Sequence, residues 1–534
     1  MTRTSTRVHS LNLGNQLIRY RLALLLFTLI YMILLLLYLG NMSIQWDEAT
    51  HLNTGITMLQ GNFNSYLSNG PFYPPLYDLA TAATFKVLGI SLFNARLVSV
   101  IFAVLSMWTL FEFVNPMYGP KVALISSIML AITPGFVWLS RLSMIETMLL
   151  FFFMVSLLFF YKWLKTNQIR NIVLSGVALG LGFIAKYQAI VGILVIFVGL
   201  IMLTKIHLKS RLKAFLLLTA IVAAFAASWF LITFQVYASQ TLNQWLYALQ
   251  MGNPQKSVYS LQFPAPIFYL IAMTWPYGTY GFAPVSIFTY IFALVGLIFL
   301  GWRRRFEDKF LLIWFFSVYL FFTLIGNKDW RYIVGVFPVL TIAAANLIVS
   351  ASKRARNYIR LKQPNSIRRI GAKFVAVCML GIIIFSVGWN CIDTTLWMIY
   401  KDERSLPVEE ATSFTSQLLG ENESLLVIAP FNQLSDGMVR FYLQSNHKQN
   451  QVWQYPSQPV DTYQPNFNTT VLIDLCQQDK IRYLLVPGSD LALPLFNTTM
   501  NMHTIYDMMN YSGRFRFERS FGNSPYSISL ASFS

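Results

Sequence analysis

The residues best able to do chemistry in this chain come directly after its first long apolar run. Asp47 and Glu48 are adjacent carboxylates, and His51 follows about one helical turn later. A carboxylate near hydrocarbon carries a desolvation cost, so a pair of acids at a membrane boundary points to a function. The alternative is a solvated loop in which both acids favour the start of a short helix from Asp47 to Gln60.

Five other charged residues flank later apolar runs: Arg141, Glu146, Lys186, Lys328 and Arg331. Each cation has a simple alternative interpretation, in which its side chain extends to the membrane interface. His51 could contact Asp47 or bind a metal, but one histidine among acids is too little to indicate a metal site. We therefore predict no required cofactor and leave a divalent metal open.

The composition indicates an integral membrane protein. The chain is 55% hydrophobic and only 12% charged, with a mean hydropathy of +0.52, whereas soluble proteins carry about 25% charged residues. The net charge of +18 could suggest nucleic acid, but 24 of the 40 Lys and Arg residues fall in six polar gaps. These gaps lie on one side of the membrane if the apolar runs alternate in direction. The basicity then orients the chain, and we predict no nucleic-acid partner.

A membrane span needs about 20 apolar residues. This criterion predicts a transmembrane unit over 21–392, with the N-terminal residues 1–20 in the cytoplasm and residues 393–534 outside, in the plasma membrane. The eleven predicted spans are 21–40, 95–114, 121–140, 147–164, 171–185, 187–204, 214–235, 281–301, 310–326, 331–350 and 373–392. In the fifth span, Gly176, Gly180 and Gly182 are spaced for tight helix packing.

The outside connections are the unusual part of this topology. Residues 41–94 are too long and polar for a plain connector, and Leu76–Ile90 predicts a helix lying on the membrane. Residues 236–280 are aromatic and predict amphipathic helices beside a mobile loop. Lys328 and Arg331 stand at the outer end of a span, where the charge rule would not place cations. An anion in the outer leaflet would explain them.

From residue 393 the composition becomes polar, which predicts a small α/β domain outside the membrane. Its expected elements are strands at 425–429, 482–486, 514–521 and 526–531, with helices at 437–444 and 470–478. The three cysteines indicate no disulfide framework. Candidate N-glycosylation sequons occur at Asn41, Asn422, Asn468, Asn497 and Asn510, all in segments assigned outside from charge alone.

Five short motifs give the chain a resemblance to a known superfamily. They are Trp46-Asp47-Glu48, Tyr73-Pro74-Pro75-Leu76-Tyr77, Arg141 followed by Glu146, Gly182-Phe183-Ile184-Ala185-Lys186-Tyr187, and Lys328-Asp329-Trp330-Arg331-Tyr332 with Pro338. In this order and topology they resemble the GT-C glycosyltransferases that use polyprenyl-phosphate sugars. The nearest branches are the protein O-mannosyltransferases and the lipid A aminoarabinose transferases. In the second branch a Lys usually precedes Pro-Pro, whereas Tyr73 stands here, which argues against an aminoarabinose donor.

The resemblance implies a transferase that moves a sugar from a polyprenyl (dolichyl) phosphate to a protein or lipid hydroxyl outside the cytoplasm. Such a transfer needs a base for the acceptor proton and cations for the departing phosphate. The implied roles are Asp47 as base, Glu48 as an orienting group and Glu146 as a second carboxylate. Lys328, Arg331, Lys186 and Arg141 are the implied phosphate contacts, and His51, Tyr73 and Tyr332 the implied substrate contacts.

Two non-catalytic alternatives stay open. A lipid-linked sugar transporter or flippase would also span the membrane many times and be basic inside. It would more often show inverted repeats and charges in the middle of its spans. A surface receptor or scaffold could use an outer domain but would have no need for eleven spans.

Overall fold

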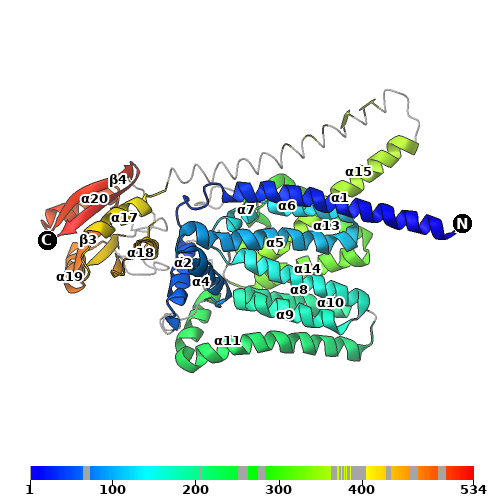
Figure 1. The fold of residues 1–534 in the computed structure, drawn as a ribbon, viewed down its shortest axis with the longest axis horizontal. Coiled ribbons are helices and arrows are strands. Elements are labelled where there is room, and N and C mark those ends of the chain that lie inside the picture. The colour runs from blue at the N-terminus through cyan, green and yellow to red at the C-terminus, as the bar shows by residue number, and fades with distance from the viewer. Residues whose placement is uncertain are drawn as a thin grey trace.

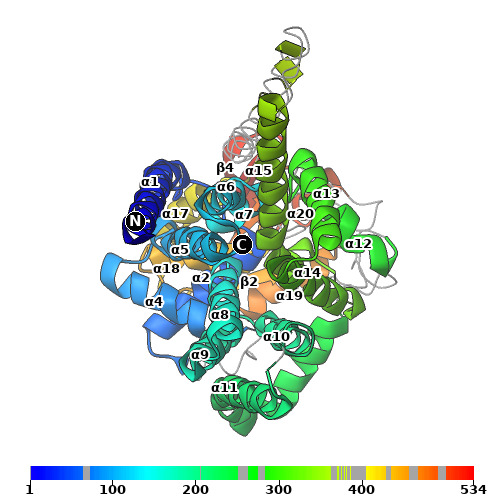
Figure 2. The same cartoon turned by 90° about the vertical axis from the view of Figure 1, so that its right-hand side faces the viewer.

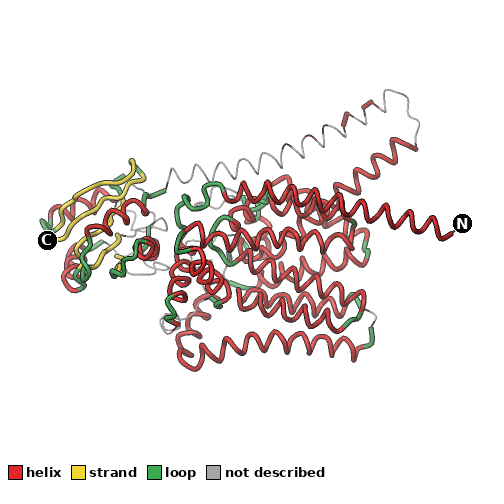
Figure 3. The backbone as a smooth tube through the Cα atoms, viewed as in Figure 1, coloured by secondary structure: helices red, strands yellow, loops and turns green. Residues whose placement is uncertain are grey.

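The structure, a computed structural model, describes residues 2–63, 73–204, 206–250, 263–274, 283–326, 328–361, 405–428, 434–455, 467–490 and 501–534, with isolated positions between 370 and 385. Long helices lie side by side in a bundle, and a smaller unit lies beyond one end of it (Figure 1). The strands are confined to the smaller unit (Figure 3). Figure 2 looks along the bundle and shows α8 (Glu146–Thr166) near its centre.

Helices occupy ten of the eleven predicted spans, and the eleventh, 373–392, lies almost entirely outside the described residues. Among the described helices, five are long and apolar enough to cross a membrane, or six with one bent pair. The count of eleven therefore stays a prediction. Besides α8, the bundle contains α1 (Thr2–Leu36), α5 (Leu92–Tyr118), α6 (Pro120–Ala131), α7 (Pro134–Ser140), α9 (Ile169–Ala185), η1 (Tyr187–Ile190), α10 (Val191–Met202), α11 (Leu208–Gln250), α12 (Ala265–Ala272), α13 (Ile287–Arg303), α14 (Phe306–Leu324), η2 (Trp330–Val336) and α15 (Phe337–Leu361).

The predicted third span is broken rather than continuous. Helices α6 and α7 meet at an angle of 66°. Pro134 begins α7, and Thr133 before it is extended, with φ −65° and ψ 123°. A proline has no N–H to donate and disfavours helical backbone in the residue before it, so the helix must restart there.

The glycines of α9 allow close packing, as their spacing predicted. A methyl group at Gly176 would lie 3.2 Å from Cβ of Ile221 on α11, and one at Gly182 would lie 3.3 Å from Cβ of Phe152 on α8. Helix α9 therefore packs between α8 and α11. Lys186 follows the last residue of α9, so this packing fixes the position of Lys186 at the end of the bundle.

Two short helices cross the end of the bundle that faces the smaller unit (Figure 1). They are α2 (Trp46–Leu59) and α4 (Leu76–Leu88), which match the two helices predicted in the 41–94 connection. In the 236–280 connection, α11 continues to Gln250 and α12 follows at Ala265–Ala272, while residues 251–262 and 275–282 lie outside the described residues.

The smaller unit contains one five-stranded sheet of order β2-β1-β3-β5-β4. Strand β1 pairs parallel with β2 and β3, whereas β5 pairs antiparallel with β3 and β4. Four of the strands and two of the helices were predicted; α17, α20 and the short β2 were not. The bounds are α17 (Val408–Leu418), β1 (Ser424–Ile428), α18 (Asp436–Ser445), β2 (Val452–Tyr455), α19 (Thr469–Gln478), β3 (Ile481–Pro487), α20 (Met502–Tyr511), β4 (Phe515–Asn523) and β5 (Tyr526–Phe533).

The smaller unit packs directly on α2 and α4 through α18. Nδ2 of Asn53 donates to the carbonyl of Gly437 at 2.7 Å, and the Phe85 and Phe441 rings lie 6.5 Å apart. Ile56 on α2 belongs to the same buried apolar cluster as the sheet residues. One face of α2 is therefore fixed by this unit, and its other contacts are made with the bundle.

Candidate active site

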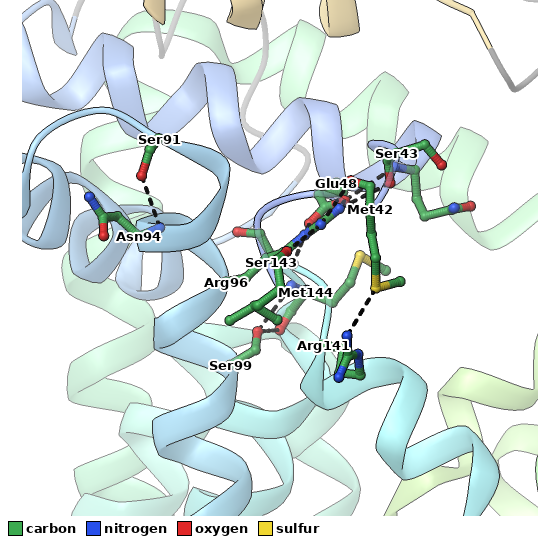
Figure 4. A network of polar contacts seen from close by, with 12 residues as sticks. Met42, Ser43, Glu48, Ser91, Asn94, Arg96, Ser99, Arg141, Ser143 and Met144 are labelled. Carbon is green, nitrogen blue, oxygen red and sulfur yellow. Dashed lines mark hydrogen bonds and ion pairs between the residues drawn. The ribbon is translucent and has the colours of Figure 1, made fainter. Parts of the chain in front are cut away.

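The two acids in the first turn of α2, Asp47 and Glu48, point in different directions. Glu48 is fully buried and accepts hydrogen bonds from Nε and Nη2 of Arg96, each at 2.7 Å. The backbone N–H groups of Ser143, at 2.6 Å, and Gln45, at 3.1 Å, donate to the same carboxylate. Figure 4 shows this network between α2, α5 and the turn before α8. Glu48 thus has four donors and is held by the protein.

Arg96 is the cation that completes this network, and it was not predicted. Its guanidinium also donates to the carbonyls of Leu39, Met42 and Ser43, at 2.7 to 3.0 Å. It therefore holds the backbone that leads from α1 into α2. A sequence signal was present, because an arginine inside an apolar run needs a buried acceptor.

Asp47 points away from Glu48 and keeps 37% of its side chain exposed. Its Oδ2 accepts from Nη1 of Arg331 at 2.5 Å. Arg331, in η2, is 13% exposed and also forms a 2.7 Å ion pair with Asp329. Asp329 caps η2 by accepting from the Arg331 N–H at 2.8 Å, which fixes the guanidinium relative to its own backbone.

The surroundings of Asp47 favour its charged form. Burial by the surrounding protein raises the pKa of Asp47, but the charge and hydrogen bond of Arg331 oppose it, with smaller contributions from His51 and Lys186. The net pKa lies below the ordinary 3.8. Asp47 is therefore an ionised carboxylate whose basicity is suppressed as long as Arg331 faces it.

Glu146 and Lys186 form a second, deeper ion pair. Nζ of Lys186 lies 2.7 Å from Oε1 of Glu146, and both side chains are buried. The same ammonium lies 6.0 Å from the ring centroid of Tyr73 and 5.7 Å from that of Tyr332. The second oxygen of Glu146, Oε2, is buried and accepts a hydrogen bond from none of the described residues.

Tyr73 and His51 close the site on the side of α4. Burial raises the pKa of Tyr73 well above 10.0, and the nearby charge of Asp47 raises it further. Nδ1 of buried His51 donates to Oδ1 of Asp78 at 2.8 Å, and its ring lies 5.1 Å from that of Tyr73. The phenol therefore stays protonated, and His51 is oriented by a carboxylate that was not predicted.

The structure therefore places six of the predicted site residues around one centre: Asp47, His51, Tyr73, Glu146, Lys186 and Arg331, with the Tyr332 ring against Lys186. No group of three or more His, Cys, Asp or Glu side chains that could hold a metal is found among the described residues.

Lys328 and Arg141 have other partners. Nζ of Lys328 donates to the carbonyls of Phe322 and Thr323 at 2.7 Å each, at the end of α14, which leaves one N–H donor. Burial lowers the pKa of Lys328 to about 8. Arg141 donates to the carbonyls of Leu34 and Leu37 in α1 and the turn after it, and burial lowers its pKa to about 10. Lys328 precedes η2, so it shares no helix with Arg331.

The sequon asparagines lie at the surface wherever they are described. Asn41, Asn422, Asn468 and Asn510 are exposed, and Asn497 lies outside the described residues. Asn468 also caps α19 by accepting from the N–H groups of Thr470 and Val471. Exposure is what a modified asparagine requires, but their use as glycosylation sites stays a prediction.

Comparisons of the sequence and of the structure with known proteins identify the fold. Residues 73–231 match the family model described as dolichyl-phosphate-mannose-protein mannosyltransferase. The structure resembles crystal structures of ArnT from Cupriavidus metallidurans in the apo state and bound to undecaprenyl phosphate, at 14% identity and TM-scores of 0.63 and 0.62. Each comparison covers 95% of this chain and 97% of that one. The chain has the fold of the GT-C glycosyltransferases. The resemblance inferred from the sequence motifs is thereby confirmed.

A second GT-C structure is more distant. The oligosaccharyltransferase AglB from Archaeoglobus fulgidus, in complex with an inhibitory peptide and a dolichol-phosphate, is 12% identical with a TM-score of 0.51. That match covers 86% of this chain and 69% of AglB. An uncharacterized protein of Aquifex aeolicus is 24% identical over 344 residues, which is 62% of this chain and 66%, just under two thirds, of that protein. The GT-C fold, together with the apolar helices, makes this chain a multi-pass membrane protein.

Proposed function

We propose that this protein transfers a sugar from a polyprenyl-phosphate donor to a hydroxyl group of a protein or lipid at the outer face of the plasma membrane, with its N-terminus in the cytoplasm. The observation that carries the proposal is the Asp47–Arg331 pair, a carboxylate and a guanidinium that share one partly open site. This reaction needs a base that takes the acceptor proton and a cation that binds the phosphate, and a guanidinium can do so through two parallel N–H donors.

In the proposed reaction the acceptor hydroxyl attacks C1 of the sugar. The bond from C1 to the phosphate oxygen breaks as the bond from C1 to the acceptor oxygen forms. The acceptor proton goes to Asp47, and the bonding electrons leave with the polyprenyl phosphate. Arg331 and Lys186 would balance the charge that develops on that phosphate. Lys328, with one donor left, would be a more distant contact.

The Asp47–Arg331 pair also gives the reaction an order. Without donor, Arg331 holds down the pKa of Asp47, so this carboxylate is a weak base. A donor phosphate at Arg331 would compensate the guanidinium charge and let the pKa of Asp47 rise towards its ordinary value. Asp47 would then become an effective base only when the donor is bound. This arrangement favours donor binding before proton transfer.

Glu48 would act indirectly in this proposal. Its four donors leave it no role in proton transfer, but its bond to the Ser143 N–H links the start of α2 to the turn that leads to Glu146. Together with Arg96 it would hold Asp47 and Glu146 at a fixed separation. We regard Glu48 and Arg96 as positioning residues.

A transfer assay tests the proposal. Purified protein in lipid is incubated with labelled polyprenyl-phosphate sugars, and label is counted in protein and in lipid acceptors separately. We expect label in one of these fractions, in wild-type protein and not in an Asp47→Asn variant. Movement of the intact labelled donor between leaflets of a vesicle, without transfer, would instead support a flippase.

A further inference from the structure

Helix α18 of the smaller unit lies against the end of the bundle, beside α2 and α4 (Figure 1). Gly437, Phe441 and Ser445, each four residues apart, make contacts there. A methyl group at Gly437 would lie 3.4 Å from Cβ of Ala49, and the Phe441 and Phe85 rings are 6.5 Å apart. The Ser445 hydroxyl donates to a carbonyl in the turn between α4 and α5 at 3.5 Å. Residues four apart share one side of a helix, so one stripe of α18 faces the bundle.

The other sides of α18 fix this helix to the sheet of the smaller unit. Val439 and Leu443 are fully buried, in the same apolar cluster as the residues of β1 and β3. At the start of the helix, the Asp436 N–H donates to Oε1 of Gln454 on β2 at 3.2 Å. Because α18 is held both at its start and along its length, the stripe that faces the bundle has a defined position relative to the sheet.

Helix α2 is held between the bundle and α18. On the bundle side, the carboxylate of Glu48 accepts four hydrogen bonds. Ala49, Leu52 and Ile56 form an apolar face of α2 that is at most 3% exposed and belongs to the same cluster as the strand residues. Consecutive residues of a helix point about 100° apart, so Glu48 and Ala49 lie on different sides of α2. The position of the first turn, which carries Asp47, therefore depends on both sides.

The apolar cluster shared with the smaller unit reaches both members of the buried Glu48–Arg96 pair. Ala49 follows Glu48 on α2, and Ala95 precedes Arg96 on α5. Both alanines are buried and belong to this cluster. The smaller unit therefore packs against both helices that carry the pair.

We propose that the smaller unit is a positioning element for catalysis, and that Gly437 is the positioning residue through which α18 sets Asp47 relative to Arg331. This inference rests on the proposed function. Arg331 is held within η2 by its own ion pair with Asp329, so a shift of α2 moves the base and leaves the guanidinium in place. Gly437 has no side chain, which lets α18 approach Ala49 closely.

The test inserts volume at this contact and separates the base from the donor site. Transfer is measured for wild type, Gly437→Val, the double variant Gly437→Val/Ala49→Gly and the control Ile528→Val. A Cβ at Gly437 already touches Ala49 and lies 3.6 Å from Nδ2 of Asn53, so two more methyl groups have no room. Ile528 is fully buried in β5, and its substitution weakens the core of the same unit without adding volume beside α2.

We expect Gly437→Val to lower kcat at least about tenfold, because a misplacement of about 1 Å can cost about 100-fold in rate. The Michaelis constant for the donor and the binding of undecaprenyl phosphate should stay within about twofold of wild type, since Arg331 and Lys186 keep their positions. The double variant should recover part of the lost kcat, because it removes the methyl group of Ala49 from the contact. Ile528→Val should keep the wild-type kcat although its melting temperature falls.

Asn53→Ala keeps the test decisive if Gly437→Val does not fold. It removes the hydrogen bond from α2 to the Gly437 carbonyl without adding volume. We expect kcat to fall about threefold, in keeping with the loss of one hydrogen bond, again with an unchanged Michaelis constant for the donor.

Four results would overturn the positioning role. A wild-type kcat in Gly437→Val and Asn53→Ala would show that α18 does not set α2. A comparable loss in Ile528→Val would show that kcat follows the stability of the unit. A raised Michaelis constant for the donor with unchanged kcat would place the effect at the donor site. A double variant without recovery would show that the loss does not pass through Ala49.

Wild-type transfer is measured first. Its absence with all donors would overturn the proposed function itself, whereas transfer that is insensitive to the contact between α2 and α18 overturns only the positioning role.

Discussion

Asp308 and Glu146, at opposite ends of the bundle, are buried carboxylates that differ in how many of their acceptors are used. At the end away from the smaller unit, Asp308 is fully buried and both of its oxygens are saturated. Oδ1 accepts from Tyr118 at 2.8 Å and from Arg303, and Oδ2 accepts from Arg303 at 2.7 Å and from the Arg305 N–H at 3.0 Å. Nearby, Lys165 in the last turn of α8 pairs with Glu307 at 2.8 Å.

At the other end, Glu146 opens α8 and leaves one oxygen without a donor among the described residues, and Asp47 keeps 37% of its side chain exposed. Both ends place carboxylates against cations, so charge alone does not distinguish them. The difference is saturation: a carboxylate whose acceptors are all used stabilises the fold, whereas one with spare acceptors can take up a ligand. The incomplete network marks the site.

Asp47→Asn should give the largest effect on transfer. The amide keeps the shape and a hydrogen-bond acceptor for Arg331 but cannot take the acceptor proton, so kcat should fall about 10³-fold, within the range for losing a general base. The measurement is transfer at saturating donor, with undecaprenyl phosphate binding and melting temperature as controls. Retention of most of the activity would reduce Asp47 to a residue of the first helical turn.

Arg331→Ala should weaken donor use by about 2–5 kcal/mol, as expected when one member of a desolvated charge pair is truncated. The loss should appear in the Michaelis constant for donor at fixed acceptor, and exceed any loss of thermal stability. Arg331→Lys should restore only part of the donor use, because an ammonium cannot replace the paired, coplanar N–H donors of a guanidinium. If the Michaelis constant for the donor is unchanged in Arg331→Ala, Arg331 merely anchors η2, and Lys186 becomes the phosphate contact to test.

Asp308→Asn, at the saturated end, should produce the reverse pattern. Weakening the bonds from Arg303 and Tyr118 should lower the free energy of unfolding by about 1.5–3 kcal/mol, the value of hydrogen bonds to a charged group. Transfer per folded molecule should stay near normal. Thermal unfolding and activity measured on the same preparation check both expectations. A stable variant with lost activity would contradict the distinction between the two ends.

The pH dependence should show the smallest effect. Asp47 must be deprotonated to act as a base, and its pKa in the free enzyme lies below 3.8. The acid limb of kcat/KM for wild type should therefore lie at or below about pH 4. In Arg331→Ala the guanidinium that lowers the pKa of Asp47 is gone, whereas burial still raises that pKa. The acid limb of kcat/KM should therefore move to higher pH. Identical limbs in the two proteins would show that Arg331 does not control Asp47.

Several features were determined by the sequence alone, because they depend on local chemistry. Helix α2 begins beside Asp47, and Pro-Pro precedes α4. Four strands and two helices of the smaller unit fall within a residue or two of their predicted bounds. The bounds of these elements follow from apolar runs and turn residues that lie within a few positions of each other in the sequence. The order of the five motifs carried the GT-C resemblance in the same way. The break before Pro134 follows from the same local chemistry, because a proline interrupts the helix that precedes it.

Only the tertiary structure decided which partner each charged group takes. Asp47 and Glu48 are adjacent in sequence, yet one faces Arg331, 284 positions away, and the other faces Arg96. Consecutive residues of a helix point about 100° apart, so packing against α5 and α18 determines which acid is buried. Saturation of an acceptor is a property of the assembled bundle, and no local pattern encodes it.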